Sequence, residues 1–209
     1  MYYEQETRTI TVFGEGAVKV SPSTVHIVLS VISRGTELAE IQQENARRMN
    51  QVIQSLQKAG ISETSIQTID FQIRPVYEYI NGDQRFQGYE VVNSIRITSN
   101  ELSQTGELVD LAVKNGANQI GSIEFTMPDQ DEQYQQALAL ALQDAETKMI
   151  TIGTSLKLQN RPIPMKIEEQ HTSQPVAFRA MTMADTGKTP IESGTITISA
   201  SLQVKYQIV

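Results

Sequence analysis

Polar and apolar residues alternate without a break over residues 195–208, near the carboxy-terminal end of the chain. Successive side chains of an extended strand point to opposite faces, so this pattern predicts a long strand with one buried and one water-facing side. Antiparallel sheets tolerate that arrangement, whereas the strands of parallel sheets are usually covered on both faces. The residues predicted to be buried are Ile196, Ile198, Ala200, Leu202, Val204, Tyr206 and Ile208.

Six further stretches of the chain have the pattern of strands. Asn81-Gly82 predicts a tight hairpin between two of them, because both central positions of a type I′ turn need a positive φ. Pro75 cannot donate a ladder hydrogen bond, so its strand is expected at a sheet edge or at a bulge. A bend is expected at Gly14-Glu15-Gly16. The predicted strands cover residues 8–14, 25–32, 69–79, 89–98, 120–127 and 163–168.

Three other stretches repeat their apolar residues at helical spacing, which predicts helices over residues 36–60, 102–114 and 128–156. Thr36 is the expected N-cap of the first helix, and Gly60 is its expected carboxy-terminal stop. Together, the elements predict an α+β fold. It consists mainly of an antiparallel sheet, with long amphipathic helices packed on one face.

The expected organisation is a single domain over residues 8–207. A helix, a glycine and an Ile-acid-Phe strand occur in that order twice. This weak internal similarity is compatible with two related α/β halves, 8–98 and 99–209. Chance reuse of the same signals for a helix end and a strand start would also produce it. Residues 171–190 have little periodicity and predict a mobile loop.

The amino-acid composition argues against several classes of protein function. The chain has 209 residues, no cysteine and a net charge of −7. The missing cysteines exclude disulfides and thiolate chemistry. The negative charge argues against binding to nucleic acid or insertion at an anionic membrane surface. No apolar leader or membrane-spanning run is found, which predicts a cytoplasmic protein, with a periplasmic or envelope form as the alternative if a leader has been removed.

Short motifs associated with catalysis or ligand binding lack their required context. Residues 185–187 (Asp-Thr-Gly) match the triplet of aspartic proteases, but no second copy is present. Residues 187–189 (Gly-Lys-Thr) lack the upstream glycine of a phosphate-binding loop, since Thr182 stands there. The acids and histidine of residues 168–171 cannot form a His-rich zinc site, because the chain has only 2 histidines. The sequence therefore predicts no catalytic residue, no metal site and no cofactor.

An ordered set of short segments resembles the SIMPL-domain family, over about residues 8–207. The resemblance implies an α+β fold and a tendency to self-assemble. No catalytic residue is established for that family, so none can be assigned here by the resemblance. The resemblance also implies a link to oxidative-stress tolerance, and many bacterial relatives are exported to the periplasm or envelope. The segments are Ile10-Thr-Val-Phe-Gly-Glu-Gly16, Ser21-Pro22, Glu44-Asn45, Gly60-Ile61, Ile66-Gln-Thr68, Pro75-Val-Tyr77, Gly88-Tyr89 with Asn93, residues 116–121, residues 190–192 and Gly194.

Five polar or aromatic residues match recurrent positions of that family. For these the resemblance implies structural hydrogen bonding within or between subunits. They are Asn45, Thr68, Tyr77, Tyr89 and Asn93.

The leading functional hypothesis is a non-enzymatic protein that assembles into a homo-oligomer, with a link to stress tolerance. Exposed strand edges have to be paired, covered or charged, and subunit contact is one way to do so. The alternative is a small-molecule binding module with a pocket between helices and sheet. A third hypothesis, a hydrolase that uses carboxylates, finds no convincing pair of acids in the sequence. No other protein partner is predicted.

Overall fold

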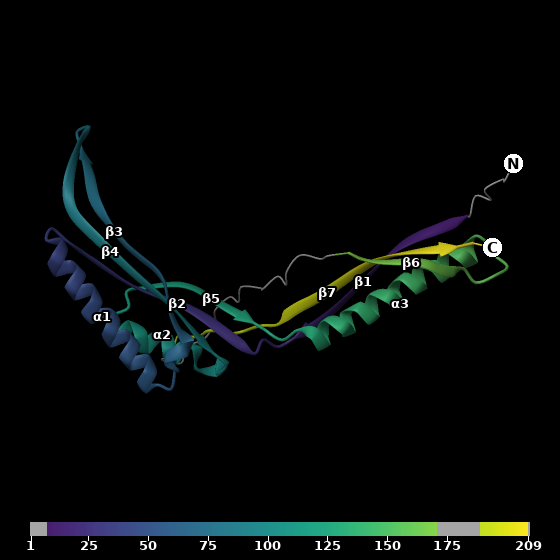
Figure 1. The fold of residues 1–209 in the computed structure, drawn as a ribbon, viewed down its shortest axis with the longest axis horizontal. Coiled ribbons are helices and arrows are strands. Elements are labelled where there is room, and N and C mark those ends of the chain that lie inside the picture. Colours follow the sequence, from purple (N-terminus) through teal and green to yellow (C-terminus); the bar gives the residue numbers. More distant parts are fainter. Residues whose placement is uncertain (1–7, 171–188, 209) are drawn as a thin grey trace. The chain divides into compact units, whose positions relative to one another are not determined.

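The computed structural model describes residues 8–170 and 189–208, which belong to two compact units (Figure 1). The second unit is inserted into the sequence of the first. The two halves 8–98 and 99–209 divide the chain elsewhere, and the internal repeat that suggested them stays a prediction. The predicted loop at 171–190 lies, up to residue 188, outside the described residues. Unit 1 comprises the described residues 8–21, 127–170 and 195–208, and unit 2 comprises 22–126 and 189–194.

Unit 2 is a four-stranded antiparallel sheet with the strand order β3-β4-β2-β5. Two helices and two short 3-10 turns complete it. Its strands are β2 (Thr24–Gly35), β3 (Ile66–Ile80), β4 (Asp83–Ser99) and β5 (Gln119–Thr126), its helices are α1 (Leu38–Lys58) and α2 (Thr105–Lys114), and the 3-10 turns are Glu63–Ser65 and Leu102–Gln104.

The core of unit 2 lies between one face of this sheet and the two helices. The odd-numbered residues of β2 from Val25 to Val31 are fully buried there, because strand side chains alternate between faces. Met49, Val52 and Leu56 of α1 pack against them, as the helical spacing predicts. Both helices therefore cover the same side of the sheet.

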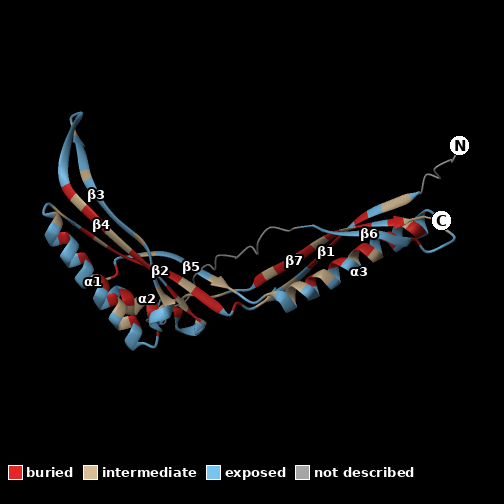
Figure 2. Cartoon of the chain, viewed as in Figure 1, coloured by how far each residue is buried: buried red, intermediate tan, exposed pale blue. Residues whose placement is uncertain are grey.

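Unit 1 is a three-stranded antiparallel sheet with the strand order β1-β7-β6, covered by one long helix. The predicted alternation of its central strand is confirmed, since the even-numbered residues from Ile196 to Tyr206 are all buried (Figure 2). The antiparallel α+β fold class is confirmed as well. The elements of unit 1 are β1 (Thr9–Val20), α3 (Asp131–Ser155), β6 (Ile163–Gln170) and β7 (Ile196–Gln207).

The expected bend at Gly14-Glu15-Gly16 is wrong, because β1 runs straight through these residues. The glycines are explained by the close approach of α3. A Cβ atom on Gly14 would lie 2.0 Å from the carbonyl oxygen of Ala141, and one on Gly16 would lie 2.0 Å from that of Ala137. The helix backbone therefore rests directly on the strand, through alanines on one side and glycines on the other.

Polar groups of α3 also cover the free edge of β1. Asp144 accepts a hydrogen bond from the Glu15 backbone N–H at 2.9 Å, and Lys148 donates one to the Phe13 carbonyl at 2.9 Å. Asp144 and Lys148 are themselves paired at 2.7 Å. An uncovered edge would invite pairing with another strand, so this pair of side chains blunts it.

The turn and cap predictions have mixed outcomes. The hairpin at Asn81-Gly82 is confirmed, with φ values of 55° and 91°. Gly60 ends α1 as predicted, with a φ of 97°, and the next N–H bonds back to the Leu56 carbonyl. Thr36 is not the N-cap, because α1 begins one residue later, with Glu37 in the cap position. Among the described residues, no helix is long and apolar enough to cross a membrane.

The contact between α3 and β1 can be tested by adding one methyl group. Gly16→Ala should lower the free energy of unfolding by about 2–3 kcal/mol, because the new Cβ meets helix backbone that cannot rotate away. Chemical denaturation measures this loss. Glu15→Gln, at an exposed position between the two glycines, is the matched control and should change stability by less than about 0.5 kcal/mol. Equal stability of Gly16→Ala and the natural chain would contradict this packing.

Candidate functional site

The β3–β4 hairpin reaches beyond the rest of its sheet (Figure 1). β2 pairs with β4 only as far as Gly35, which lies opposite Tyr89. Residues 83–88 of β4 therefore pair with β3 alone. α1 lies over β2 and β4. The side of β3 that faces in the same direction as the core is consequently left uncovered.

An apolar surface occupies this uncovered side, and we call it the aromatic face: Phe71, Ile73, Tyr77, Phe86 and Tyr89. Phe71 and Ile73 pair with Asn93 and Val91, which point toward the core side of β4. The Phe86 ring makes edge-to-face contacts with Tyr77 at 5.8 Å and with Tyr89 at 5.1 Å between ring centres.

Four of these side chains are well exposed. Phe71 is 51% exposed, Ile73 39%, Tyr77 47% and Phe86 49%, whereas Tyr89 is half-buried. Figure 2 shows the outer part of the hairpin as almost entirely exposed. Isolated apolar side chains on a surface need no explanation, but a contiguous patch of this kind marks an interaction site.

Pro75 lies in β3. The sequence predicts a sheet edge or a bulge at this residue, and both are confirmed. β3 is an edge strand, and its pairing is irregular at the adjacent Val76 and Tyr77. A proline has no N–H to offer an added strand. Extension of the sheet along β3 is therefore interrupted at Pro75, and the face of the hairpin is more accessible to a partner than its edge.

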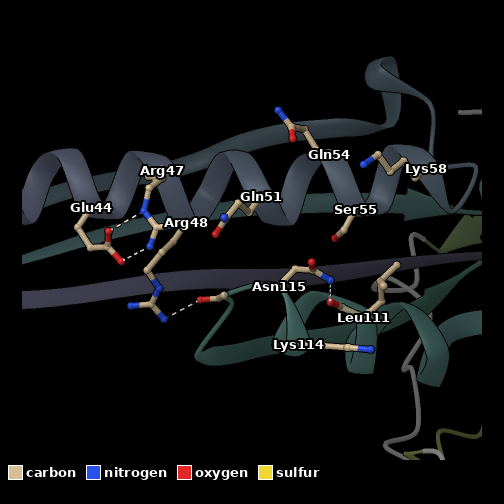
Figure 3. Close-up of a pocket in the computed structure, with 11 residues that line it drawn as sticks. Glu44, Arg47, Arg48, Gln51, Gln54, Ser55, Lys58, Leu111, Lys114 and Asn115 are labelled. Atoms are coloured by element: carbon tan, nitrogen blue, oxygen red, sulfur yellow. Dashed lines mark hydrogen bonds and ion pairs between the residues drawn. The ribbon is translucent and has the colours of Figure 1, made fainter.

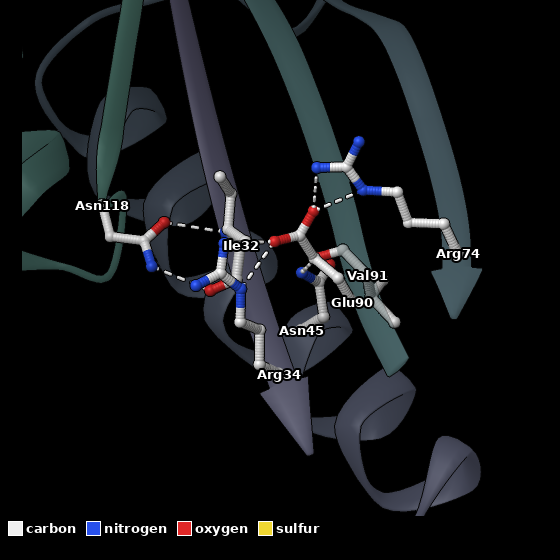
Figure 4. Close-up of polar contacts among 7 residues, drawn as sticks. All are labelled: Ile32, Arg34, Asn45, Arg74, Glu90, Val91 and Asn118. Atoms are coloured by element: carbon white, nitrogen blue, oxygen red, sulfur yellow. Dashed lines mark hydrogen bonds and ion pairs between the residues drawn. The ribbon is translucent and has the colours of Figure 1, made fainter. Parts of the chain in front are cut away.

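An ion triad around a buried glutamate lies on the opposite side of the sheet, at the base of the hairpin (Figure 4). Glu90 of β4 is 1% exposed and lies between Arg34 of β2 and Arg74 of β3, which are its partners in the strand register. Arg34 donates to one carboxylate oxygen at 2.6 Å, and Arg74 donates to the other at 2.7 Å. The triad joins the three strands at the point where β2 ends.

Burial and hydrogen bonding act in opposite directions on Glu90. Burial alone would raise the pKa of its carboxyl, but the hydrogen bonds from Arg34 and Arg74 outweigh this effect and hold the pKa below the usual value. Sequence reasoning missed this residue. The available signal was a charged residue inside the apolar run of residues 89–92, which is unusual unless the charge is paired.

Two asparagines complete the polar contacts at this end of the sheet (Figure 4). Asn45, fully buried on α1, donates to the carbonyl of Val31 at 2.8 Å and to that of Val91 at 3.2 Å. Asn118 bonds to both backbone groups of Ile32, at 2.7 and 2.8 Å, just before β5 begins. Asn45 thus ties the helix to β2 and β4, and Asn118 extends the ladder along the edge of β2.

The residues predicted from the family resemblance all fall in unit 2. Asn45 comes from the helix, while Tyr77 and Tyr89 belong to the aromatic face. Thr68 and Asn93 are on neighbouring strands, opposite Ile95 and Phe71 respectively. The structure thus brings the five to the same side of the sheet. Their role in contacts between subunits stays a prediction.

The motifs considered for catalysis or metal binding all fall within residues 168–189. Residues 185–188, including the Asp-Thr-Gly triplet, and His171 lie outside the described part of the chain. Within the described ranges, no three His, Asp or Glu side chains are grouped so that they could hold a metal ion.

Comparison with known proteins identifies the family. The family model SIMPL, described as a protein of unknown function (DUF541), matches residues 10–206. The chain belongs to this family. It is similar to the 26 kDa periplasmic immunogenic protein of Brucella melitensis, with 28% identity over 95% of this chain and 84% of that protein. It is also similar to the uncharacterized protein YggE of Escherichia coli K12, with 24% identity over 65% of this chain and 55% of that protein.

The relative from Brucella is named as a periplasmic protein, and its similarity extends over nearly the whole chain. This finding contradicts the cytoplasmic location expected from the sequence. The physical reason is that export is directed by a leader segment that is removed from the mature protein. The composition of the folded chain therefore carries no signal that separates the two compartments.

The ion triad predicts a defined pH dependence of stability. Glu90→Gln should lower the free energy of unfolding at pH 7 by about 1–2 kcal/mol, a modest value because both arginines are more than half exposed to solvent. Because the folded pKa of Glu90 is lowered, its contribution is complete above the ordinary glutamate pKa of 4.5 and is lost as the pH falls through the folded value.

Denaturation curves of Glu90→Gln and the natural chain, recorded from pH 7 down to about pH 3, measure this difference. The gap between the two should be constant near neutrality and should narrow in acid. Glu78→Gln, at an exposed position of the same hairpin, is the control. A gap that widens in acid would contradict the stabilising role of the triad.

Proposed function

We propose that this protein is a non-enzymatic, self-assembling component of the periplasm, and that the aromatic face is the contact between subunits. The carrying observation is the exposure of Phe71, Tyr77 and Phe86 on the part of the hairpin that α1 leaves uncovered. Aromatic side chains are enriched at the energetic centres of protein interfaces. The periplasmic location is supported by the name of the Brucella relative.

The lack of charge on the aromatic face supports a second copy of the chain as the partner. By the alternation of strand side chains, the β3 residues that share this side, at every second position from Phe71 to Tyr79, are all uncharged, whereas the charged residues Arg74, Glu78, Asp83 and Arg85 point to the opposite side of the hairpin. A two-fold interface brings the same patch of both subunits together, so it has to be complementary to itself. An uncharged apolar face meets that requirement, whereas a patch of one sign would repel its copy.

The absence of enzymatic activity is part of the proposal. Among the described residues, Glu90 is the only buried carboxylate, and both of its oxygens are engaged by arginines. A carboxylate held ionised in this way is poorly suited to donate or accept a proton near neutral pH. The link to stress tolerance implied by the family resemblance belongs to this proposal too, as the cellular role of the assembly.

Self-assembly can be tested by making the aromatic face polar. The natural chain should form a defined oligomer in light scattering over a wide concentration range. Phe71→Ser combined with Phe86→Ser should shift the mass to the monomer, because both substitutions remove apolar area from the contact. Val113→Ser, at an equally exposed apolar position on α2, is the control and should leave the mass unchanged. A monomeric natural chain at every concentration would disprove the proposal.

A groove in unit 1 supports a second candidate function, the binding of an apolar small molecule. α3 covers β1 and β7 but not β6, and a groove of about 640 Å³ opens on that side of the helix. Leu142 and Met149 of α3 line it, together with Ile167 of β6 and Tyr206 of β7, and the Arg161–Glu146 ion pair is at its border. Its volume lies within the usual range for ligand sites.

Native mass spectrometry of freshly purified protein tests this second function. A bound apolar molecule should appear as a discrete added mass, and Ile167→Asn should reduce its occupancy, because the substitution places an amide in the apolar wall. Leu156→Asn, at an exposed position away from the groove, is the matched control. If no added mass is found and no lipid or metabolite raises the melting temperature, this function is excluded.

A further inference from the structure

A second groove, in unit 2, lies where the outer sides of α1 and α2 meet (Figure 3). Its volume is about 650 Å³, enough for a ligand of the size of a phosphorylated sugar. Four basic side chains and one acidic side chain line it. This excess of positive charge stands out in a chain whose net charge is −7. The groove is separate from the aromatic face, so its capacity to bind a ligand is independent of the proposed self-assembly.

Only one of the four basic groups is held in an ion pair within the described structure. Arg47 is engaged by Glu44 through two hydrogen bonds, at 2.8 and 2.7 Å. Arg48, Lys58 and Lys114 form no ion pair with any described carboxylate. The pKa of Glu44 is lowered mainly by its hydrogen bond with Arg47 and also by the charge of Arg48. The lining as a whole keeps an excess of three positive charges, and the basic side chains come from two different helices.

The side chain of Arg48 is held in place by the backbone at the end of α2. Its guanidinium donates to the carbonyl of Gly116 at 2.8 Å, which holds the side chain across the end of α2 (Figure 3). Gly116 ends that helix with a φ of 125°, and a Cβ atom there would lie 3.3 Å from the Cβ of Arg48. The glycine conformation thus makes room for the arginine. Within the described ranges its remaining N–H groups have no hydrogen-bond partner, so they can bind a ligand.

Helix ends alone do not account for this cluster of charges. Lys58 and Lys114 are in the last turns of their helices, where a positive charge interacts favourably with the helix dipole. Arg48 is near the middle of α1, so the same explanation does not apply to it. In addition, both helices end in backbone hydrogen bonds that satisfy their last carbonyls, from Ile61 to Leu56 and from Ala117 to Ala112.

We propose that the α1–α2 groove binds a small molecule that carries two or more phosphate or carboxylate groups. Arg48 matches the geometry of either group with paired N–H donors. Lys58 and Lys114 are compact positive charges on flexible stems, and these suit the second anionic group of a ligand whose exact length varies. The amides of Gln51 and Gln54, which also line the groove, offer neutral hydrogen bonds to the body of the ligand.

Titration calorimetry at low ionic strength tests the groove, with pyrophosphate and citrate as the phosphate and carboxylate probes. Both should bind to the full chain, acetate at the same concentration should not, and added salt should weaken binding. Lys58→Gln combined with Lys114→Gln should weaken binding at least about tenfold. Lys19→Gln combined with Lys205→Gln removes the same charge from exposed positions in unit 1 and should change binding by less than about twofold.

Three results would overturn the proposal. The first is no binding of either probe to the natural chain. The second is equal weakening in the two double variants, which would show an effect of net charge alone. The third is a change of oligomer mass in Lys58→Gln with Lys114→Gln without any binding of anions, which would make the groove a subunit contact. Light scattering and thermal unfolding of both double variants keep these outcomes distinct from a loss of folding and from a failure of self-assembly.

Discussion

A mismatch in length between one helix and the strands beneath it determines the surface of unit 2. α1 has 21 residues and spans about 32 Å, at 1.5 Å per residue. β4 has 17 residues and spans about 56 Å, at roughly 3.3 Å per residue. The helix therefore cannot cover the strand, and it lies over β4 and β2 while β3 is left outside. Apolar side chains continue past the covered part, and this continuation is the aromatic face.

The uncovered hairpin is held in place by polar contacts on both sides of β4. The contacts involve the side chain of Glu90 and the backbone of its neighbour Val91. Glu90 joins two arginines on one side, and the backbone of Val91 is tied to the helix by Asn45 on the other. A hairpin that projected freely would lose conformational entropy on binding a partner. These anchors at its base reduce that cost, because the strands are ordered beforehand.

Local sequence patterns were sufficient to predict most of the helices, strands and turns, because the spacing of apolar residues and the conformational preferences of turn residues act over only a few positions. The strand over 195–208 and the turn at Asn81-Gly82 belong to this group. Pairings between distant residues could not be predicted in this way. Glu90 meets Arg34 across 56 positions, and nothing near Glu90 in the sequence indicates that partner. The prediction of a bend at the glycines of β1 was wrong for the same reason, since the helix that rests on them lies more than a hundred positions further along the chain.

The insertion of one unit within the other has a consequence for how the chain reaches its native state. β1 pairs with β7 in a ladder that matches Thr9 with Gln207, whereas the strands of the inserted unit pair within residues 24–126. Contacts between such distant positions form slowly, because a long loop has to close first. During synthesis all four strands of the inserted unit are made long before β7 leaves the ribosome, and until then β1 lacks the strand with which it pairs. An unpaired strand of this kind is prone to aggregation. It is therefore a segment that a chaperone would protect until β7 has been made.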